Sequence, residues 1–243
     1  MTKTVVITGG NRGIGLGMVK ELLKRSDVGK LFATTRNPAK SPELKAISDP
    51  RLQIVQMDVE SDDSVYKGVH EVSISKALGS SGVDILINNA GVLISVDINT
   101  PINRKDAEHN FKVNCVSVMV VTQAFHDLLK TAAKQNGHSL IVNVGALLAS
   151  NKCLHGSGPR HFTGYAMSKA GMNMFTTNVS LDWKEDGIRC VVLHPGWVQT
   201  DMGGAEAPLT VEESTSCMVD TIFKLKEEHN GLFYDWKLNP IPW

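Results

Sequence analysis

The sequence predicts a single α/β domain in which helices cover both faces of a doubly wound parallel sheet. Short apolar runs rich in β-branched residues recur along the chain, helical patterns separate them, and a glycine-rich turn follows the first run. Strands that are apolar on both faces are typical of a parallel sheet buried between helices. Their alternation with helices implies right-handed crossovers and a doubly wound order.

Six strands and an edge strand are predicted in chain order: TVVIT at 4–8, LFATT at 31–35, LQIVQM at 52–57, DILIN at 84–88, SLIVNV at 139–144, IRCVVLH at 188–194 and, at the edge, GLFYDW at 231–236. Helical patterns between them include residues 14–25 and 107–130. No linker or change of composition divides the 243 residues, so we expect one domain over residues 1–243.

The composition excludes several classes of protein. Hydrophobic residues make up 42% and charged residues 21% of the chain, as in ordinary globular proteins. The formal net charge is zero, so we expect no nucleic-acid partner. No apolar run is long enough for a signal peptide or a membrane span, so we expect no membrane partner. Four widely spaced cysteines without a CxxC pair favour reduced thiols and a cytoplasmic protein.

The stretch TGGNRGIG at 8–15 lies between the first predicted strand and the first predicted helix. Glycines let the backbone turn tightly and approach a pyrophosphate, while the helix N-terminus offers free N–H groups. In this context the pattern predicts a dinucleotide-binding (Rossmann) site. The alternative is a glycine turn that only packs the helix on the strand. The residues expected to contact the cofactor are Gly9, Asn11, Arg12, Gly13, Ile14 and Gly15.

The end of the second predicted strand favours NADP(H) as the cofactor. An NAD site normally has an acidic residue here for the ribose 2′-hydroxyl, whereas this chain reads TTRNP. Arg36 and Arg12 are placed to bind the additional phosphate; the alternative is that both are solvated surface charges. After the third strand, Asp58 and Val59 are expected beside the adenine, and Asp58 is equally suited to cap a helix.

Two further polar motifs follow predicted strands, NNAG at 88–91 and YAMSK at 165–169. On a helix, Tyr165 and Lys169 share one face because they are four residues apart. A phenol has a pKa of about 10, and an adjacent ammonium group favours the phenolate, which makes the tyrosine a usable acid or base. The alternative is a surface pair of no chemical importance.

With these motifs in order, the sequence resembles the short-chain dehydrogenase/reductase family over essentially its full length. TGGNRGIG matches the family's TGxxxGxG, NNAG its strand-four motif, and YAMSK its YxxxK. Within the family the chain is most similar to carbonyl reductases of the sniffer type, because of NRGIGLG near the start and HPGWVQTDMGG at 194–204. The resemblance implies NADPH-dependent reduction of an aldehyde, ketone or quinone, and a homodimer or homotetramer.

The resemblance also implies roles for individual residues. Tyr165 would give its proton to the carbonyl oxygen, Lys169 would lower the pKa of Tyr165 and bind the nicotinamide ribose, and Asn114 would hold a water of the proton relay. The small-molecule substrate would lie between loops at about 145–164 and 197–215. Further cofactor-binding residues implied by the resemblance are Asn88, Ala90, Gly91, Pro195, Gly196, Val198 and Thr200.

One position departs from the family pattern. After strand five, family members usually read NxSSxxG, and the second serine donates a hydrogen bond to the substrate oxygen. In NVGALLA these positions hold Gly145 and Ala146, so the donor is missing. Removing one such donor typically costs about 10² to 10³ in rate. Ser150, or else His155 or His161, is a candidate substitute.

Two alternatives stay open. Cys153, His155 and His161 have side chains that fit a zinc site, but no fourth ligand is evident, so we expect no metal. The missing serine also favours a second function from a different class, an NADP(H)-binding protein without turnover that acts as a sensor or scaffold.

Overall fold

The computed structural model describes residues 2–76, 78–154 and 161–243. Within them, seven parallel strands form one sheet in the order β3-β2-β1-β4-β5-β6-β7. The order reverses between β1 and β4, as in a doubly wound sheet, and it confirms the predicted fold class. The strands are β1 Lys3–Ile7, β2 Val28–Thr35, β3 Leu52–Gln56, β4 Ile85–Asn88, β5 Ser139–Val144, β6 Ile188–His194 and β7 Phe233–Asp235.

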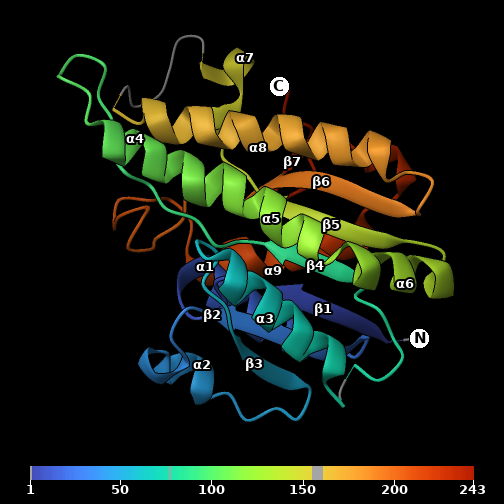
Figure 1. Cartoon of the computed structure of the whole chain (residues 1–243). Helices are drawn as coiled ribbons and strands as arrows, with labels where there is room; N and C mark the ends of the chain where they lie inside the picture. Colours follow the sequence, from blue (N-terminus) through green and yellow to red (C-terminus); the bar gives the residue numbers. More distant parts are fainter. Residues whose placement is uncertain (1, 77, 155–160) are drawn as a thin grey trace.

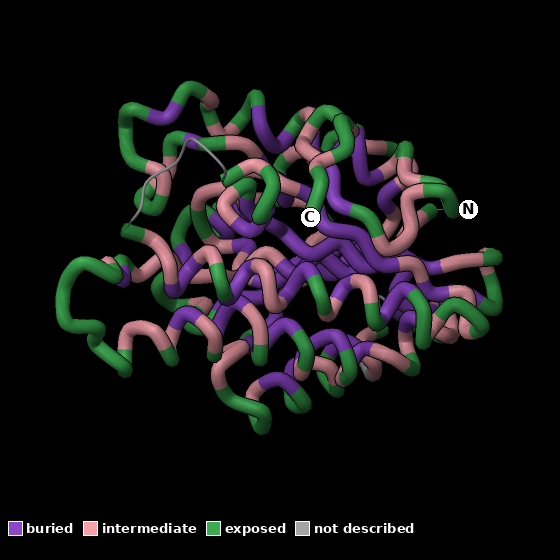
Figure 2. Tube along the Cα trace, turned by 90° about the horizontal axis from the view of Figure 1, so that it is seen from above, coloured by how far each residue is buried: buried purple, intermediate pink, exposed green. Residues whose placement is uncertain are grey.

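Helices cover both faces of the sheet, with α3 and α5 in front of it and α9 behind it in Figure 1. Figure 2 shows the strands buried at the centre and exposed residues on the outer faces of the helices. The longer helices are α1 Gly13–Lys24, α3 Asp62–Ile74, α4 Arg104–Phe111, α5 Ser117–Ala124, α6 His126–Asn136, α8 Thr163–Asp182 and α9 Val211–Lys224. The shorter ones are η1 Pro38–Lys40, α2 Pro42–Lys45, η3 Leu147–Ala149, α7 Asn151–Leu154 and η4 Glu227–His229.

Two apolar layers hold the helices on the sheet. Behind it, Leu22 of α1 and Ile222 of α9 pack against the strands; in front, Val72 of α3 and Val121 of α5 do so. Burying a side chain of this size contributes roughly 1.5 to 3 kcal/mol relative to leaving it exposed. Because both faces are covered, the strands read as continuous apolar runs rather than as alternating ones.

The predicted single helix over 107–130 is wrong in one respect. The structure divides this region into α4, a π-helical turn η2 at Lys112–Val116, α5 and α6. In η2 the side chain of Asn114 turns inward and hydrogen-bonds to the loop after β4. A π-helical turn inserts one residue into a helix, and such turns are frequent at functional sites. Apolar periodicity does not reveal this insertion, because it depends on partners from elsewhere in the chain.

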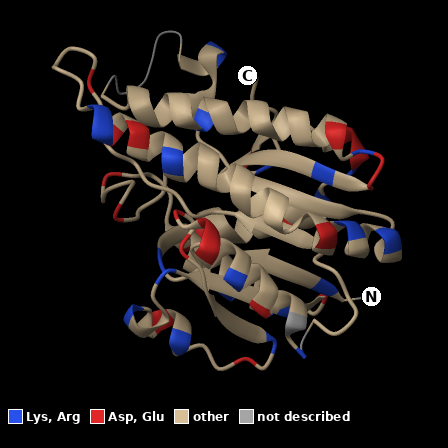
Figure 3. Cartoon of the chain, in the orientation of Figure 1, with Lys and Arg blue, Asp and Glu red and all other residues tan. Residues whose placement is uncertain are grey.

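Charges are distributed over the helices and loops. Figure 3 shows Lys and Arg mixed with Asp and Glu on the face in view. Among the helices that the structure describes, none combines the length and the apolar character needed to cross a membrane.

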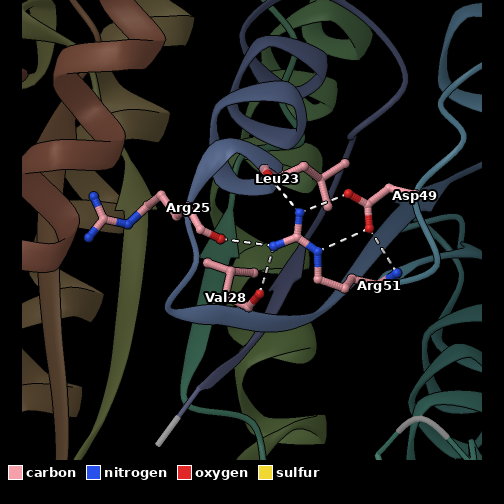
Figure 4. A network of polar contacts seen from close by, with 5 residues as sticks. All are labelled: Leu23, Arg25, Val28, Asp49 and Arg51. Atoms are coloured by element: carbon pink, nitrogen blue, oxygen red, sulfur yellow. Dashed lines mark hydrogen bonds and ion pairs between the residues drawn. The ribbon is translucent and has the colours of Figure 1, made fainter.

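Arg51 joins the end of α1, the start of β2 and the turn before β3, as Figure 4 shows. The glycine-rich turn lies at the other end of α1. Its guanidinium donates to the carbonyl of Leu23 in the last turn of α1 and to those of Arg25 (2.8 Å) and Val28 (2.9 Å). Asp49 accepts two further bonds from it, at 2.8 and 3.0 Å. The last carbonyls of a helix lack partners within the helix, so this guanidinium satisfies groups that α1 leaves open.

We predict that Arg51→Met lowers the free energy of unfolding by about 2 kcal/mol, because hydrogen bonds from a charged group contribute about 1.5 to 3 kcal/mol. Urea unfolding followed by circular dichroism measures the change. Arg104→Met is the matched control, since Arg104 is 88% exposed and forms a long ion pair, 3.9 Å, with Glu108. Equal loss of stability in the two variants would contradict this role of Arg51.

Candidate active site

The glycine-rich turn forms a cradle that only glycine can build. Gly9 and Gly13 have φ angles of +66° and +51°, in the left-handed region that other residues rarely adopt. A Cβ on Gly15 would lie 2.1 Å from the carbonyl oxygen of Gly9. Arg12, the N-cap of α1, makes no side-chain capping bond, and the first turn holds no acidic residue. The cradle therefore fits the pyrophosphate of a dinucleotide, because amide groups at the start of α1 are open to an anion.

The NNAG motif fixes this turn from the adjacent strand. Thr8 Oγ1 accepts hydrogen bonds from the backbone N–H groups of Asn89 (3.0 Å) and Ala90 (3.1 Å). Asn89 Nδ2 donates to the carbonyls of Thr8 (2.9 Å) and Gly9 (3.1 Å). Neither Asn89 nor Thr8 is among the predicted site residues, although both belong to the NNAG and TGGNRGIG motifs. The Asn89 side chain therefore fixes the backbone at the start of the cradle.

Asn88, predicted to bind the cofactor, has its side chain in the interior. Its Nδ2 donates to Thr122 Oγ1 (2.9 Å) and Asn143 Oδ1 (2.8 Å), and Asn143 in turn donates to Thr176 Oγ1 (2.9 Å). These buried bonds tie the ends of β4 and β5 to the helices in front of them. Because both amide hydrogens are used within the protein, the groups of Asn88 left for a cofactor are its side-chain oxygen and its backbone.

The residues predicted at the adenosine end lie after β1, β2 and β3, at the same edge of the sheet. Arg12 pairs with Asp201 at 3.1 Å, but both side chains are more than 70% exposed, at 74% and 85%. Such pairs contribute little, so a phosphate can replace Asp201 as the partner of Arg12. Arg36 is exposed directly after β2. Asp58 accepts a bond from the backbone of Glu60 at 3.1 Å.

The alternative that Asp58 caps a helix is wrong. Helix α3 begins at Asp62 and its N-cap is Ser61, whose hydroxyl accepts from the backbone N–H of Ser64. Val59 lines a small cavity of about 10 Å³ together with Ala90. The structure thus brings Val59 next to the strand-four motif, and its contact with the cofactor stays a prediction.

The segment after β6 closes the cradle from the other side. A Cβ on Gly13 would lie 3.4 Å from the methyl group of Thr200. Thr200 Oγ1 accepts a bond at 3.0 Å from the N–H of Gly203, and the carbonyl of Pro195 accepts one at 2.7 Å from Ser214 of α9. Gly196 has a φ angle of +84° and Val198 is buried against Leu209. All four predicted residues of this segment therefore lie at one edge with the glycine-rich turn.

Tyr165 and Lys169 lie one turn apart on α8, and both are buried. Lys169 Nζ donates at 2.7 Å to the carbonyl of Val144, the last residue of β5. Burial lowers the pKa of Lys169 to about 8, since a buried ammonium loses its hydration. Burial also raises the pKa of Tyr165 to about 12. The expected lowering of the Tyr165 pKa by Lys169 is therefore not observed in the protein alone.

Asn114 connects this pair to the loop after β4. Its Oδ1 accepts from the N–H of Val92 (2.9 Å), and its Nδ2 donates to the carbonyl of Val92 (2.8 Å) and to Ser168 Oγ (3.1 Å). Ser168 donates to the carbonyl of Tyr165 at 2.7 Å. A Cβ on Gly91 would lie 3.0 Å from Asn114 Oδ1 and 3.7 Å from Lys169 Nζ. Tyr165, Lys169, Asn114 and Gly91 are thus brought together, and Ser168, whose role no sequence motif indicated, joins them.

The two positions that lack serine differ in their surroundings. A Cβ on Gly145 would lie 2.3 Å from Val192 Cγ1 and 3.3 Å from the ring of Phe233. The space of the first serine is therefore filled from β6 and β7. Ala146, the second position, is extended, 7% exposed and precedes the turn η3.

The proposed substitutes for the missing donor are not free in the described residues. Ser150 is fully buried; its hydroxyl donates to the carbonyl of Pro242 at 2.5 Å and accepts from the N–H of Cys153 at 3.1 Å. His161 is 63% exposed and pairs with Asp97 at 3.5 Å. His155 lies outside the described residues. Among the residues that are described, no three His, Cys, Asp or Glu side chains come together as metal ligands.

The chain belongs to the short chain dehydrogenase family, whose sequence model matches residues 3–208. This agrees with the sheet order, the glycine cradle and the Tyr165–Lys169 pair. It also confirms the resemblance inferred from the motifs, and it makes the chain a member of a family of oxidoreductases.

Solved structures refine the likeness. The carbonyl reductase Sniffer of D. melanogaster is 34% identical with a TM-score of 0.93, and the match covers 100% of both chains. An NADPH-bound carbonyl reductase from chicken fatty liver is 34% identical with a TM-score of 0.94, covering 100% of this chain and 94% of that one. An uncharacterised oxidoreductase of Schizosaccharomyces pombe is 31% identical over 262 residues, 99% of this chain and 98% of the relative.

We predict that Gly145→Ser lowers the free energy of unfolding by about 1 to 3 kcal/mol, the usual cost of overpacking, because its Cβ meets Val192 and Phe233. Ala146→Ser is the matched comparison and should change stability by about 1 kcal/mol or less. Thermal unfolding of the two variants in parallel measures the difference. Equal melting temperatures would show that the packing behind Gly145 is not a barrier.

Proposed function

We propose that this protein is an NADPH-dependent reductase of a carbonyl compound, an aldehyde, ketone or quinone. The observation that carries the proposal is the meeting of Tyr165, Lys169 and Asn114 with the glycine cradle at one edge of the sheet. The similarity to carbonyl reductases supports the substrate class. The loops that would border the substrate are residues 145–164 and 197–215.

The state of Tyr165 suits reduction. Its raised pKa of about 12 keeps the phenol protonated at neutral pH, which is the form that gives a proton to a carbonyl oxygen. NADPH supplies the hydride when bound. Lys169 is cationic below about pH 8, where its charge favours the phenolate left behind by Tyr165. The side chain of Asn114 is fully engaged as a donor, so holding a relay water falls to its remaining acceptor positions.

The missing serine sets the expected strength of the enzyme. With a methyl group at Ala146, the substrate oxygen receives a hydrogen bond from Tyr165 but none from position 146. Loss of one such donor raises the barrier by about 2.7 to 4 kcal/mol. We therefore expect a slow reductase rather than an inactive one, because the proton donor itself is in place.

The cofactor preference follows from charge. No acidic residue follows β2, and exposed Arg36 stands where the ribose 2′-phosphate would lie. Arg12 is held only by an exposed pair with Asp201. Two guanidinium groups at this edge favour NADPH over NADH, since a phosphate forms charge-assisted bonds with arginine.

A second candidate function is an NADP(H)-binding protein without turnover, acting as a sensor or scaffold. The observation that favours it is Ala146, together with the commitment of Ser150 to Pro242. Both functions require the cradle, and they differ in whether Tyr165 takes part in a reaction.

We also propose that a second copy of the chain packs against α8, giving a homodimer or homotetramer in the cytoplasm. Met167, Met174 and Leu181 are 56%, 63% and 67% exposed, and their spacing of seven residues aligns them along one side of α8. Val116 and Met119 add exposed apolar surface on the adjacent η2 and α5. A helix stripe of this kind pairs with itself about a twofold axis. Four free cysteines support a reducing compartment.

We predict that purified protein oxidises NADPH in the presence of aldehydes, ketones or quinones and that Tyr165→Phe abolishes this turnover, because the phenol supplies the proton. Ala146→Ser should raise kcat, by up to about 10²-fold, because it restores a donor. Nicotinamide absorbance measures both, with NADPH binding checked by fluorescence. Bound NADPH without any difference between the protein and Tyr165→Phe would favour the second candidate.

We predict that Met174→Lys shifts the protein toward monomer, because it places a charge in the apolar stripe. Light scattering coupled to size exclusion measures the mass. Met202→Lys is the control, since Met202 is 47% exposed but lies away from α8 in the segment after β6. A mass unchanged by Met174→Lys would place the contact elsewhere.

A further inference from the structure

Residues 239–243, here called the terminal segment, contact both ends of the loop after β5, which borders the proposed substrate site. We infer that the terminal segment holds the loop 146–154 in position and that Ser150 and Trp243 are positioning residues of the carbonyl site. The inference rests on the proposed function for its kinetic consequence, whereas its structural consequence is independent of any reaction.

The terminal segment is itself fixed to the sheet. The N–H of Asp235 donates to the carbonyl of Asn239 at 2.9 Å, and Tyr234 and Pro240 form an antiparallel bridge. The N–H of Ile241 then donates to the carbonyl of Phe233 at 2.8 Å. The chain therefore turns back along β7, and these bonds to the sheet fix the position of Pro242 and Trp243.

From there the segment reaches the far end of the loop. Ser150 Oγ donates to the carbonyl of Pro242 at 2.5 Å, and the N–H of Lys152 donates to the carbonyl of Trp243 at 3.4 Å. Ser150 also accepts from the N–H of Cys153 at 3.1 Å, which orders the start of α7. A buried hydroxyl without its acceptor is costly, so Ser150 holds the loop to the segment.

The same segment also reaches the near end of the loop. The Trp243 ring stacks on Phe233 with centroids 5.7 Å apart and planes at 23°. Phe233 lies directly against Gly145, 3.3 Å from where a Cβ would stand. Gly145 follows Val144, whose carbonyl accepts the bond from Lys169. Trp243 is thus two contacts away from the backbone that Lys169 binds.

Between these two ends the loop supports itself only locally. In the described residues, the N–H of Ala149 donates to the carbonyl of Ala146 (2.9 Å), and that of Ser150 to the carbonyl of Leu147 (3.0 Å). The N–H of Leu154 donates to the carbonyl of Ser150 at 3.1 Å. All three bonds join residues three or four positions apart, in η3 or α7. The position of Ala146 relative to Tyr165 therefore depends on packing against α8 and on the anchors at either end.

This arrangement separates two roles for Ser150. If Ser150 donated to the substrate oxygen in place of the missing serine, its loss would lower kcat and Trp243 would not matter. As an anchor, Ser150 acts together with Trp243, so that loss of either loosens the same loop. Substitutions at residues that act as one unit are not additive.

The experiment compares Ser150→Ala, Trp243→Ala and the double variant, with Trp243→Phe as the conservative variant and Lys237→Ala as an exposed control near the segment. Each single variant should raise KM for the carbonyl compound about three- to tenfold with a smaller change in kcat, and the double variant should be no worse than the more severe single one. Trp243→Phe should restore KM, and the affinity for NADPH should stay unchanged. A fall in kcat for Ser150→Ala with Trp243→Ala unaffected would overturn the inference.

A readout without turnover keeps the test independent of the proposed function. Trypsin cleavage after Lys152, identified by mass spectrometry with NADPH present, reports opening of the loop and α7. Both single variants should be cleaved about tenfold faster than the parent or Lys237→Ala, because a site cut through local opening follows the free energy of that opening. Unchanged cleavage in both variants would overturn the inference even if no substrate is found. Faster cleavage without activity in any variant would retain the anchor and reject the reductase.

Discussion

The hydrogen bond from Lys169 to the carbonyl of Val144 is the interaction on which the rest of the site depends. A buried ammonium needs an acceptor, and here the acceptor is the carbonyl of Val144, the last residue of β5. The bond fixes α8 against the end of the sheet, and Tyr165, one turn earlier, is fixed with it. Ser168 and Asn114 extend the same connection to the loop after β4. The hydrogen bonds of Lys169, Ser168 and Asn114 thereby hold the proton donor Tyr165 in place relative to the loop after β4, which also supports the cofactor cradle.

Much of the fold follows from local patterns. The apolar runs at 139–144 and 188–194 match β5 and β6 residue for residue, and the edge strand predicted at 231–236 is β7, shortened to Phe233–Asp235. Prediction failed where tertiary contacts decide. The helix over 107–130 reads as continuous because no glycine or proline interrupts it, and the bonds of Asn114 to Val92 and Ser168 explain the extra residue.

The site shows the same division. Motifs that consist of a required residue type, such as the glycines of the cradle or Tyr165 and Lys169, could be found in the sequence. Partners chosen by proximity could not: Asp201 faces Arg12 across the cradle, and Asn89 supports it from β4. The direction of the Tyr165 pKa was also beyond the sequence. Spacing shows that a lysine is near, whereas burial, which here dominates, depends on everything packed around the phenol.

The filled space behind Gly145 limits which related sequences this backbone can accept. Val192 and Phe233 occupy the volume where a first serine would place its Cβ. Placing two serines here therefore lowers stability unless a smaller side chain stands at position 192 or 233, and Phe233 is also the surface on which Trp243 stacks. A smaller side chain at position 233 would make room for the serine but remove the stacking of Trp243. Either order of substitution therefore passes through a less stable protein. The packing of the core around Gly145, rather than the chemistry of the reaction, therefore keeps a serine out of this position.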